Sequence, residues 1–158
     1  MKKVISLVLA VLLITALFAG CGSTESASSS DVIKVAIVQQ LDHSSLDEIR
    51  VAIEAEFQDA KYSVKSFNGQ NDASMLNQIG TQIVSDKVDM IIPIATMAAQ
   101  CMVTAADGTN IPIVYAACSD PESAGLTGIA NVTGVSDALN TPFILDMMLA
   151  AQIGRAHV

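Results

Sequence analysis

The sequence predicts an α/β fold: a doubly wound parallel sheet of about five strands, with helices on both faces. Short apolar runs rich in β-branched residues recur along the chain, and segments with helical periodicity separate them. Strands and helices that alternate in this way form parallel sheets. The apolar runs are nearly continuous, as expected of strands that are buried on both sides.

The expected strands share a bounded run of apolar residues, and they lie at residues 32–38, 62–67, 88–94, 111–116 and 129–135. The first helix follows the first strand and opens at a capping box formed by Ser45 and Glu48. Its apolar side chains recur at helical spacing, which predicts that one face packs on the sheet. That face carries Leu46, Ile49, Ile53 and Phe57.

Each later helix has its own start signal. A turn cluster at residues 68–72 precedes the second helix, whose inner side carries Met75, Leu76, Ile79, Ile83 and Val84. Thr96 is expected to cap a third helix that runs to about Ala106. Asp120 followed by Pro121 predicts a short helix, because both residues suit a first turn. The series gives one flavodoxin-like unit, with another helix beginning after residue 136.

The first 20 residues have the layout of a lipoprotein signal peptide. Two lysines precede an apolar run at residues 4–18, and Ala19-Gly20-Cys21 follows it. This ending resembles a bacterial lipobox, in which Cys21 is acylated after cleavage; the alternative is an ordinary cleaved signal. Residues 21–31 are Ser-rich and polar, which predicts a flexible tether between membrane and domain.

Charge and cysteine content exclude several classes of protein. The chain has a net charge of −8 and no cluster of basic residues, so nucleic acid is not an expected partner. No cysteine or histidine pair has metal-ligand spacing, and no nucleotide-binding or nucleophile-elbow motif occurs, so we expect no metal, cofactor or enzymatic activity. Cys101 and Cys118 are interpreted as two buried thiols, although a disulfide is compatible with export.

Three polar loops lie at the expected carboxyl ends of strands, where open α/β sheets bind ligands. They are residues 39–44, 95–99 and 118–120. Each loop precedes a predicted helix start, which favours an anion such as a carboxylate. Asp42 or Asp120 could hold a positive group, so a zwitterion would fit. The alternative is that Thr96 and Asp120 only cap helices and that His43, in the first loop, is solvated.

At these loops the sequence resembles the ABC-transporter substrate-binding lipoproteins related to tryptophan and tyrosine uptake. The matching stretches are residues 35–39, 43, 46–47, 89–100, 111–114, 119–121, 124–126 and 131–137. The resemblance implies a type I periplasmic-binding fold, with two lobes, a hinge and a ligand in the cleft between them. It implies a set of ligand contacts in the first lobe, namely Gln40, His43, Thr96, Ala98, Ser119 and Asp120. Met97 stands where the family often has Pro, and Cys118-Ser119 where Val or Ala and Thr are common, which leaves the ligand open.

The resemblance implies a monomeric, extracytoplasmic, membrane-anchored protein that captures a small solute for an ABC permease and is not an enzyme. The solute is expected to be an amino acid, aromatic ones included. Two alternatives stay open: a lipid-anchored sensor that signals to a membrane kinase, and an exported hydrolase using Ser44 and His43.

The length predicts that the chain is an N-terminal fragment, because two lobes need about twice as many residues. Residues 32–136 would form the first ligand-binding lobe and residues 137–152 the start of the hinge or second lobe. Residues 153–158 match a translated sequencing adapter and are expected to be non-biological.

Overall fold

A computed structural model describes residues 32–151 of the chain. The predicted signal peptide, the lipidated Cys21, the whole predicted tether and the predicted non-biological tail lie outside the described residues. Those assignments therefore stay predictions.

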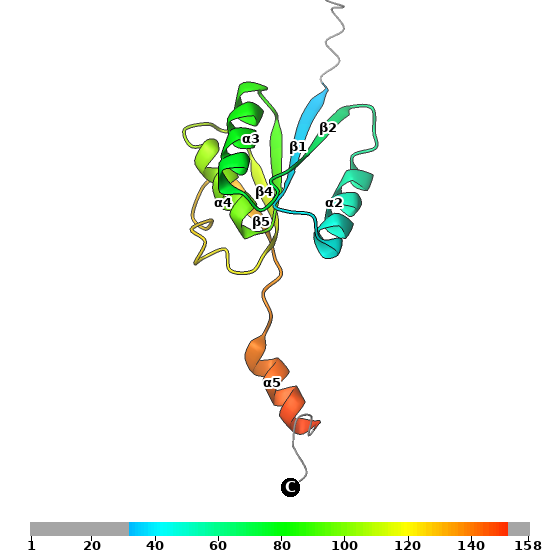
Figure 1. Ribbon diagram of the computed structural model, residues 1–158, viewed down its shortest axis with the longest axis vertical. Coiled ribbons are helices and arrows are strands. Elements are labelled where there is room, and N and C mark those ends of the chain that lie inside the picture. The colour runs from blue at the N-terminus through cyan, green and yellow to red at the C-terminus, as the bar shows by residue number, and fades with distance from the viewer. Residues whose placement is uncertain (1–31, 152–158) are drawn as a thin grey trace, which may run out of the picture. The chain divides into compact units, whose positions relative to one another are not determined.

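The described chain builds one parallel sheet in the strand order β2-β1-β3-β4-β5 (Figure 1). Every neighbouring pair of strands runs in the same direction, which confirms the predicted fold class. Helices cover both faces, with α3 and α4 on one side and α2 on the other (Figure 1). The strands are β1 (Ile33–Gln39), β2 (Tyr62–Asn68), β3 (Met90–Ile94), β4 (Ile113–Cys118) and β5 (Val132–Ser136).

The observed strands end further along the chain than predicted in four of the five cases. Polar residues join the ladder at the carboxyl ends, because their backbone groups pair even though their side chains are not apolar: Gln39 is paired with both Asn68 and Ile94. In β4, an irregular register lies between Tyr115 and Cys118. The apolar runs thus located the strands, while backbone pairing decided where they end.

The helices are α2 (Ser44–Glu56), α3 (Ala73–Ser85), α4 (Thr96–Ala105) and α5 (Thr141–Ala150). Two predicted caps are wrong. His43, in extended backbone, caps α2 through Nδ1, which accepts the Ser45 N–H at 3.3 Å, so Ser45 is already helical. Ala95 is the N-cap of α4, without a side-chain hydrogen bond, because Thr96 is the first helical residue and its hydroxyl lies beside Cys118.

The short helix predicted at Asp120 is also wrong. Residues 121–125 form turns, and the chain then runs irregularly into β5. Asp120 does behave as a cap would, because its backbone carbonyl accepts the N–H of Ala124 at 3.0 Å. The turn ends at Gly125, which has a φ of +72°. A positive φ stops helical propagation, and glycine adopts it without steric cost.

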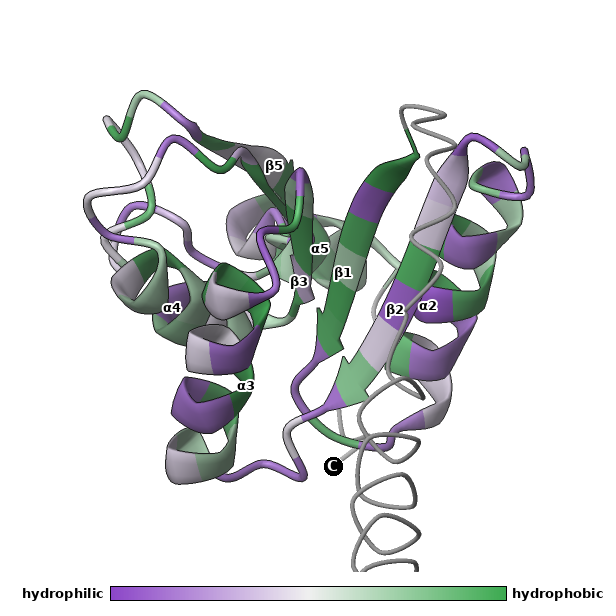
Figure 2. Cartoon of the chain, turned by 90° about the horizontal axis from the view of Figure 1, so that it is seen from above, coloured by the Kyte–Doolittle hydropathy of each residue, from purple (hydrophilic) through white to green (hydrophobic). Residues whose placement is uncertain are grey.

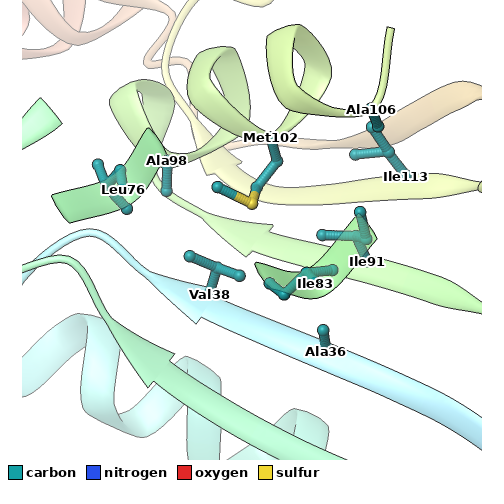
Figure 3. Close-up of a cluster of buried hydrophobic side chains, with 9 residues drawn as sticks. All are labelled: Ala36, Val38, Leu76, Ile83, Ile91, Ala98, Met102, Ala106 and Ile113. Atoms are coloured by element: carbon teal, nitrogen blue, oxygen red, sulfur yellow. The ribbon is translucent and has the colours of Figure 1, made fainter. Parts of the chain in front are cut away.

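Two apolar layers hold the helices on the sheet. The layer under α3 and α4 has its buried side chains from both helices and from three strands (Figure 3). They are Ala36, Val38, Leu76, Ile83, Ile91, Ala98, Met102, Ala106 and Ile113. Under α2, the four apolar residues predicted for its inner face pack against Val35, Ile37, Ile92 and Ile94. In Figure 2, β1 is mostly green, whereas α2 and α3 also carry purple bands.

The last helix, α5, falls within the segment where a further helix was predicted, and it has no buried side chain. Phe143 and Leu149 are among its exposed apolar residues, at 57% and 62% of full exposure. Over residues 32–151, no helix is both long enough and apolar enough to cross a membrane.

We expect Ile83→Ala to lower the free energy of unfolding by about 2–5 kcal/mol, because it empties a fully buried position between α3 and the sheet. Val51→Ala is a matched control, since Val51 is 54% exposed on α2 and its truncation should change stability by less than about 0.5 kcal/mol. Urea unfolding followed by circular dichroism measures both changes. Equal losses in the two variants would contradict this account of the core.

Candidate ligand-binding site

The carboxyl ends of the strands bring the three predicted loops to one edge of the sheet. Gln39 at the end of β1 is level with Asn68 of β2 and Ile94 of β3. The Ala95 N–H then bonds the carbonyl of Ala116 in β4 at 2.9 Å. We call this edge, with the loops after β1, β2, β3 and β4, the carboxyl rim.

The N-terminus of α4 is the part of the carboxyl rim best suited to bind an anion. Its cap, Ala95, has φ 77° and ψ 162°, a strained conformation for a residue with a Cβ. The Met97 N–H is satisfied by Gln40 Oε1 at 3.0 Å. Among the described residues, no acceptor is found for the N–H groups of Thr96 and Ala98. Free N–H groups at the positive end of a helix favour a bound anion.

The two predicted ligand contacts on α4, Thr96 and Ala98, differ in how accessible they are to a ligand. Thr96 is half-buried, and its Oγ1 lies 3.5 Å from the buried Cys118 Sγ. Its hydroxyl therefore points toward β4 and can turn between that sulfur and the rim. Ala98 is fully buried, backbone included, so this residue offers no exposed group to a ligand.

The third predicted loop contributes exposed polar groups. Asp120 binds the Ser123 N–H at 3.0 Å and the Ser123 hydroxyl at 2.5 Å. These hydrogen bonds, the hydroxyl's first, lower the pKa of the exposed Asp120 carboxyl. Ser119 is exposed, and its carbonyl accepts the Ser136 hydroxyl at 3.4 Å. The rim thus presents a charged carboxylate beside the end of β4.

The remaining predicted contacts lie in the loop after β1. Gln40 is half-buried and bonds the start of α4, so the structure brings Gln40 and Thr96 together. His43 is exposed, and the hydrogen bond described for it is the cap of α2. Within the described chain, no hydrogen bond joins His43 to the other five predicted contacts.

A polar network next to the rim was not predicted from the sequence. Gln39 is 1% exposed, and its Nε2 donates to Leu41 O and to Asp47 Oδ1, both at 2.7 Å. Arg50 Nε donates to Gln39 Oε1 at 3.1 Å, and Arg50 also pairs with Glu54. A polar residue directly after an apolar strand was the available signal.

Glu54, in the last turn of α2, completes this network. It accepts the Ser66 hydroxyl at 2.5 Å and Arg50 Nη1 at 2.9 Å. The bond from Ser66, followed by Arg50, lowers the pKa of Glu54. Beside the network lies a hollow of about 210 Å³ whose lining includes Gln39, Arg50 and Asn68. A larger hollow of about 450 Å³ lies at the opposite end of the sheet, away from the helix N-termini.

The turn after β2 also lies at the carboxyl rim, although the sequence analysis did not include it in the predicted site. Asn68 donates to Asp42, and Asn71 Oδ1 accepts Gln40 Nε2 at 2.9 Å. The sequence showed this cluster only as a turn, but its position after a strand places it on the same edge as the other loops.

Cys101 and Cys118 are free thiols, as the sequence analysis favoured. Cys118 is buried, whereas Cys101 is half-buried, and burial raises the pKa of the Cys101 thiol. The part of the chain covered by the structure contains no cluster of His, Cys, Asp or Glu suited to a metal ion.

An open parallel α/β lobe with polar loops and a free helix N-terminus at its carboxyl edge is a ligand-binding lobe in architecture. The family model for ABC transporter substrate binding proteins matches residues 34–145. This chain belongs to the ABC transporter substrate-binding protein family. The match confirms the resemblance found in the sequence.

Individual relatives agree with this assignment. A tyrosine-binding protein of Clostridioides difficile is 30% identical, and the match covers 93% of this chain and 48% of that protein. Among solved structures, an ABC domain in complex with L-Trp from Streptococcus pneumonia is 32% identical with a TM-score of 0.61, covering 67% of this chain and 39% of the other. A ligand-free, open substrate binding protein from Clostridium difficile is 32% identical with a TM-score of 0.66, covering 75% and 43%. The chain thus spans less than half the length of these relatives.

We expect Glu54→Gln to lower the free energy of unfolding at pH 7 by about 0.5–1 kcal/mol, because it removes a half-exposed charged pair. The folded-state pKa is depressed, so the stabilisation is complete above the unfolded-state pKa and is lost as pH falls through the folded one. The difference from the wild type should therefore shrink on acidification. Glu56→Gln, at an exposed position of the same helix, is the control, and urea unfolding at several pH values is the measurement. A pH-independent difference would contradict the assignment.

Proposed function

We propose that this chain is the first ligand-binding lobe of an extracytoplasmic receptor for an ABC importer, and that its solute is an amino acid. One observation carries the proposal. Unpartnered N–H groups at the start of α4 lie on the same sheet edge as the exposed Asp120 carboxylate. An anion-binding group and a cation-binding group on one edge suit a zwitterion.

In this proposal, the ligand carboxylate is held by the N–H group and the hydroxyl of Thr96 at the start of α4. The ammonium group faces Asp120, and the Ser119 hydroxyl supplies a further hydrogen bond. Charge-assisted hydrogen bonds of this kind are stronger than neutral ones. Gln40 and His43 border the site on the side of α2.

The relatives support an amino acid and suggest which to test first. One is named a tyrosine-binding protein, and another was solved with L-Trp. The rim described here is formed by one lobe, and it is open to solvent. We therefore propose that a second lobe supplies the other wall, that hinge closure traps the ligand, and that the closed form delivers it to a permease.

Location is part of the proposal. We infer that the chain is exported and is held at the membrane by acylated Cys21, with residues 21–31 as the tether. Two or three acyl chains anchor a protein firmly, because each buried methylene contributes about 0.8 kcal/mol.

The ligand proposal can be tested by NMR on residues 22–152. Addition of L-Trp, L-Tyr or L-Phe should shift the amide signals of residues 96–98 and 119–120, with fast exchange because half of the cleft is absent. Thr96→Val should weaken these shifts several-fold, since it removes the hydroxyl. Thr104→Val is the matched control: it alters the same helix, but its hydroxyl bonds only Gln100 O.

Two results would contradict the proposal in different ways. Shifts centred on another part of the lobe would remove the rim from the ligand site. Tight binding in calorimetry by this single lobe would show that the site is complete without a second wall.

We expect Cys21→Ser to abolish incorporation of labelled fatty acid and to move the protein from the membrane fraction to the soluble extracytoplasmic fraction. Cys101→Ser should leave both properties unchanged, because acylation requires the cysteine after the signal. Metabolic labelling and cell fractionation measure the two effects. Labelling that survives in Cys21→Ser would exclude the lipid anchor at this position.

A further inference from the structure

Gln40 makes hydrogen bonds with all four of its polar groups, and they reach three different segments. Its N–H donates to Ile94 O at 3.2 Å, and its carbonyl accepts the Asn71 N–H at 2.8 Å. The side-chain Oε1 accepts the Met97 N–H at 3.0 Å, and Nε2 donates to Asn71 Oδ1 at 2.9 Å. The amide orientation is fixed, because only the oxygen can face the Met97 N–H.

The segments that Gln40 joins have strained backbones. Gln70 and Asn71 have φ of 51° and 58°, and Ala95, the cap of α4, has φ of 77°. Such conformations persist only where surrounding contacts determine them. The turn also approaches Gln40 closely at Gly69, where a Cβ would lie 3.2 Å from Gln40 O and would overlap Leu76.

Gln40 also takes the role of a capping side chain at the start of α4. The N-cap of α4 has no side-chain hydrogen bond of its own, and the Gln40 amide satisfies a first-turn N–H from a distant part of the sequence. This bond leaves the N–H group of the neighbouring, half-buried Thr96 without a partner among the described residues. Gln40 therefore determines which groups at this helix start remain available.

We propose that Gln40 is a positioning residue: it holds the start of α4 and the turn after β2 in place and does not itself bind the ligand. This role deepens the proposed function and rests on it for the identity of the ligand. Both polar atoms of the side chain already bond protein groups, which fix the orientation of the amide.

Three variants separate the possibilities. Gln40→Met keeps the length and removes both side-chain hydrogen bonds. Gln40→Glu keeps them, because one oxygen accepts the Met97 N–H and the other accepts Nδ2 of a flipped Asn71 amide; its charge also suits the positive end of α4. Asn71→Gly removes one anchor of Gln40 on another loop and relieves the strain there.

The first measurement is amide hydrogen exchange by NMR, without ligand. Exchange of the Met97 N–H should be faster by about fivefold in Gln40→Met, since a hydrogen bond of ordinary strength is lost. Gln40→Glu should restore the wild-type rate, and Asn71→Gly should raise it. Unchanged exchange in Gln40→Met, or an effect of Gln40→Glu equal to that of Met, would overturn the proposal. If Gln40→Met does not fold, Gln40→Glu and Asn71→Gly decide the question by the same criteria.

The second measurement is titration of the folded variants with L-Trp, monitored at the amides of residues 96–98. Asn71→Gly should weaken the response, because the loss of the Asn71 bond leaves the Gln40 side chain less firmly held against the start of α4. A direct ligand contact by Gln40 predicts the opposite, since Asn71→Gly frees Nε2 to bind, and a stronger response would exclude the positioning role. If the wild type does not respond to L-Trp, L-Tyr or L-Phe, the ligand proposal fails, while the exchange rates still decide the role of Gln40.

Discussion

The parallel pairing of β1 on both of its sides is the constraint on which this structure depends. Because β1 lies between β2 and β3 with Gln39 level with Asn68 and Ile94, the loops after all three strands start at the same height. The strand register alone therefore brings the residues of these loops close together. The hydrogen bonds across the carboxyl rim, including those of Gln40, are consequences of this register.

The sequence was sufficient for the architecture, because the architecture depends on apolar patterning. The buried strands are short apolar runs, and the inner faces of α2 and α3 have the helical spacing that their packing requires. The edge of the sheet that carries the site followed from topology alone. Residues such as Thr96 and Asp120 were found because they follow strands, and the structure places them on that edge.

Contacts between residues that are distant in the chain could not be predicted from the sequence. Capping preferences favoured Thr96 over Ala95 as the cap of α4, but a glutamine from the loop after β1 satisfies that helix start. The family resemblance implied Ala98 as a contact, although this residue is buried in the core. Asn71 was missed because a turn gives no sign of which loop it touches. Local propensity describes neighbours in the chain, and this rim is built from segments that are distant in the chain.

The order of the strands has a consequence for how the lobe is made. β1 is the first strand to leave a ribosome or an export channel, yet both of its partners come later, and β3 comes only after two helices and another strand. Until β3 is present, one side of the central strand has unpaired backbone groups and uncovered Val and Ile side chains. Nonlocal parallel pairing of this kind is slow and leaves the nascent chain prone to aggregation. Synthesis and folding of this lobe are therefore coupled: the segment before β3 cannot complete its central strand, however stable its own helix and strand are.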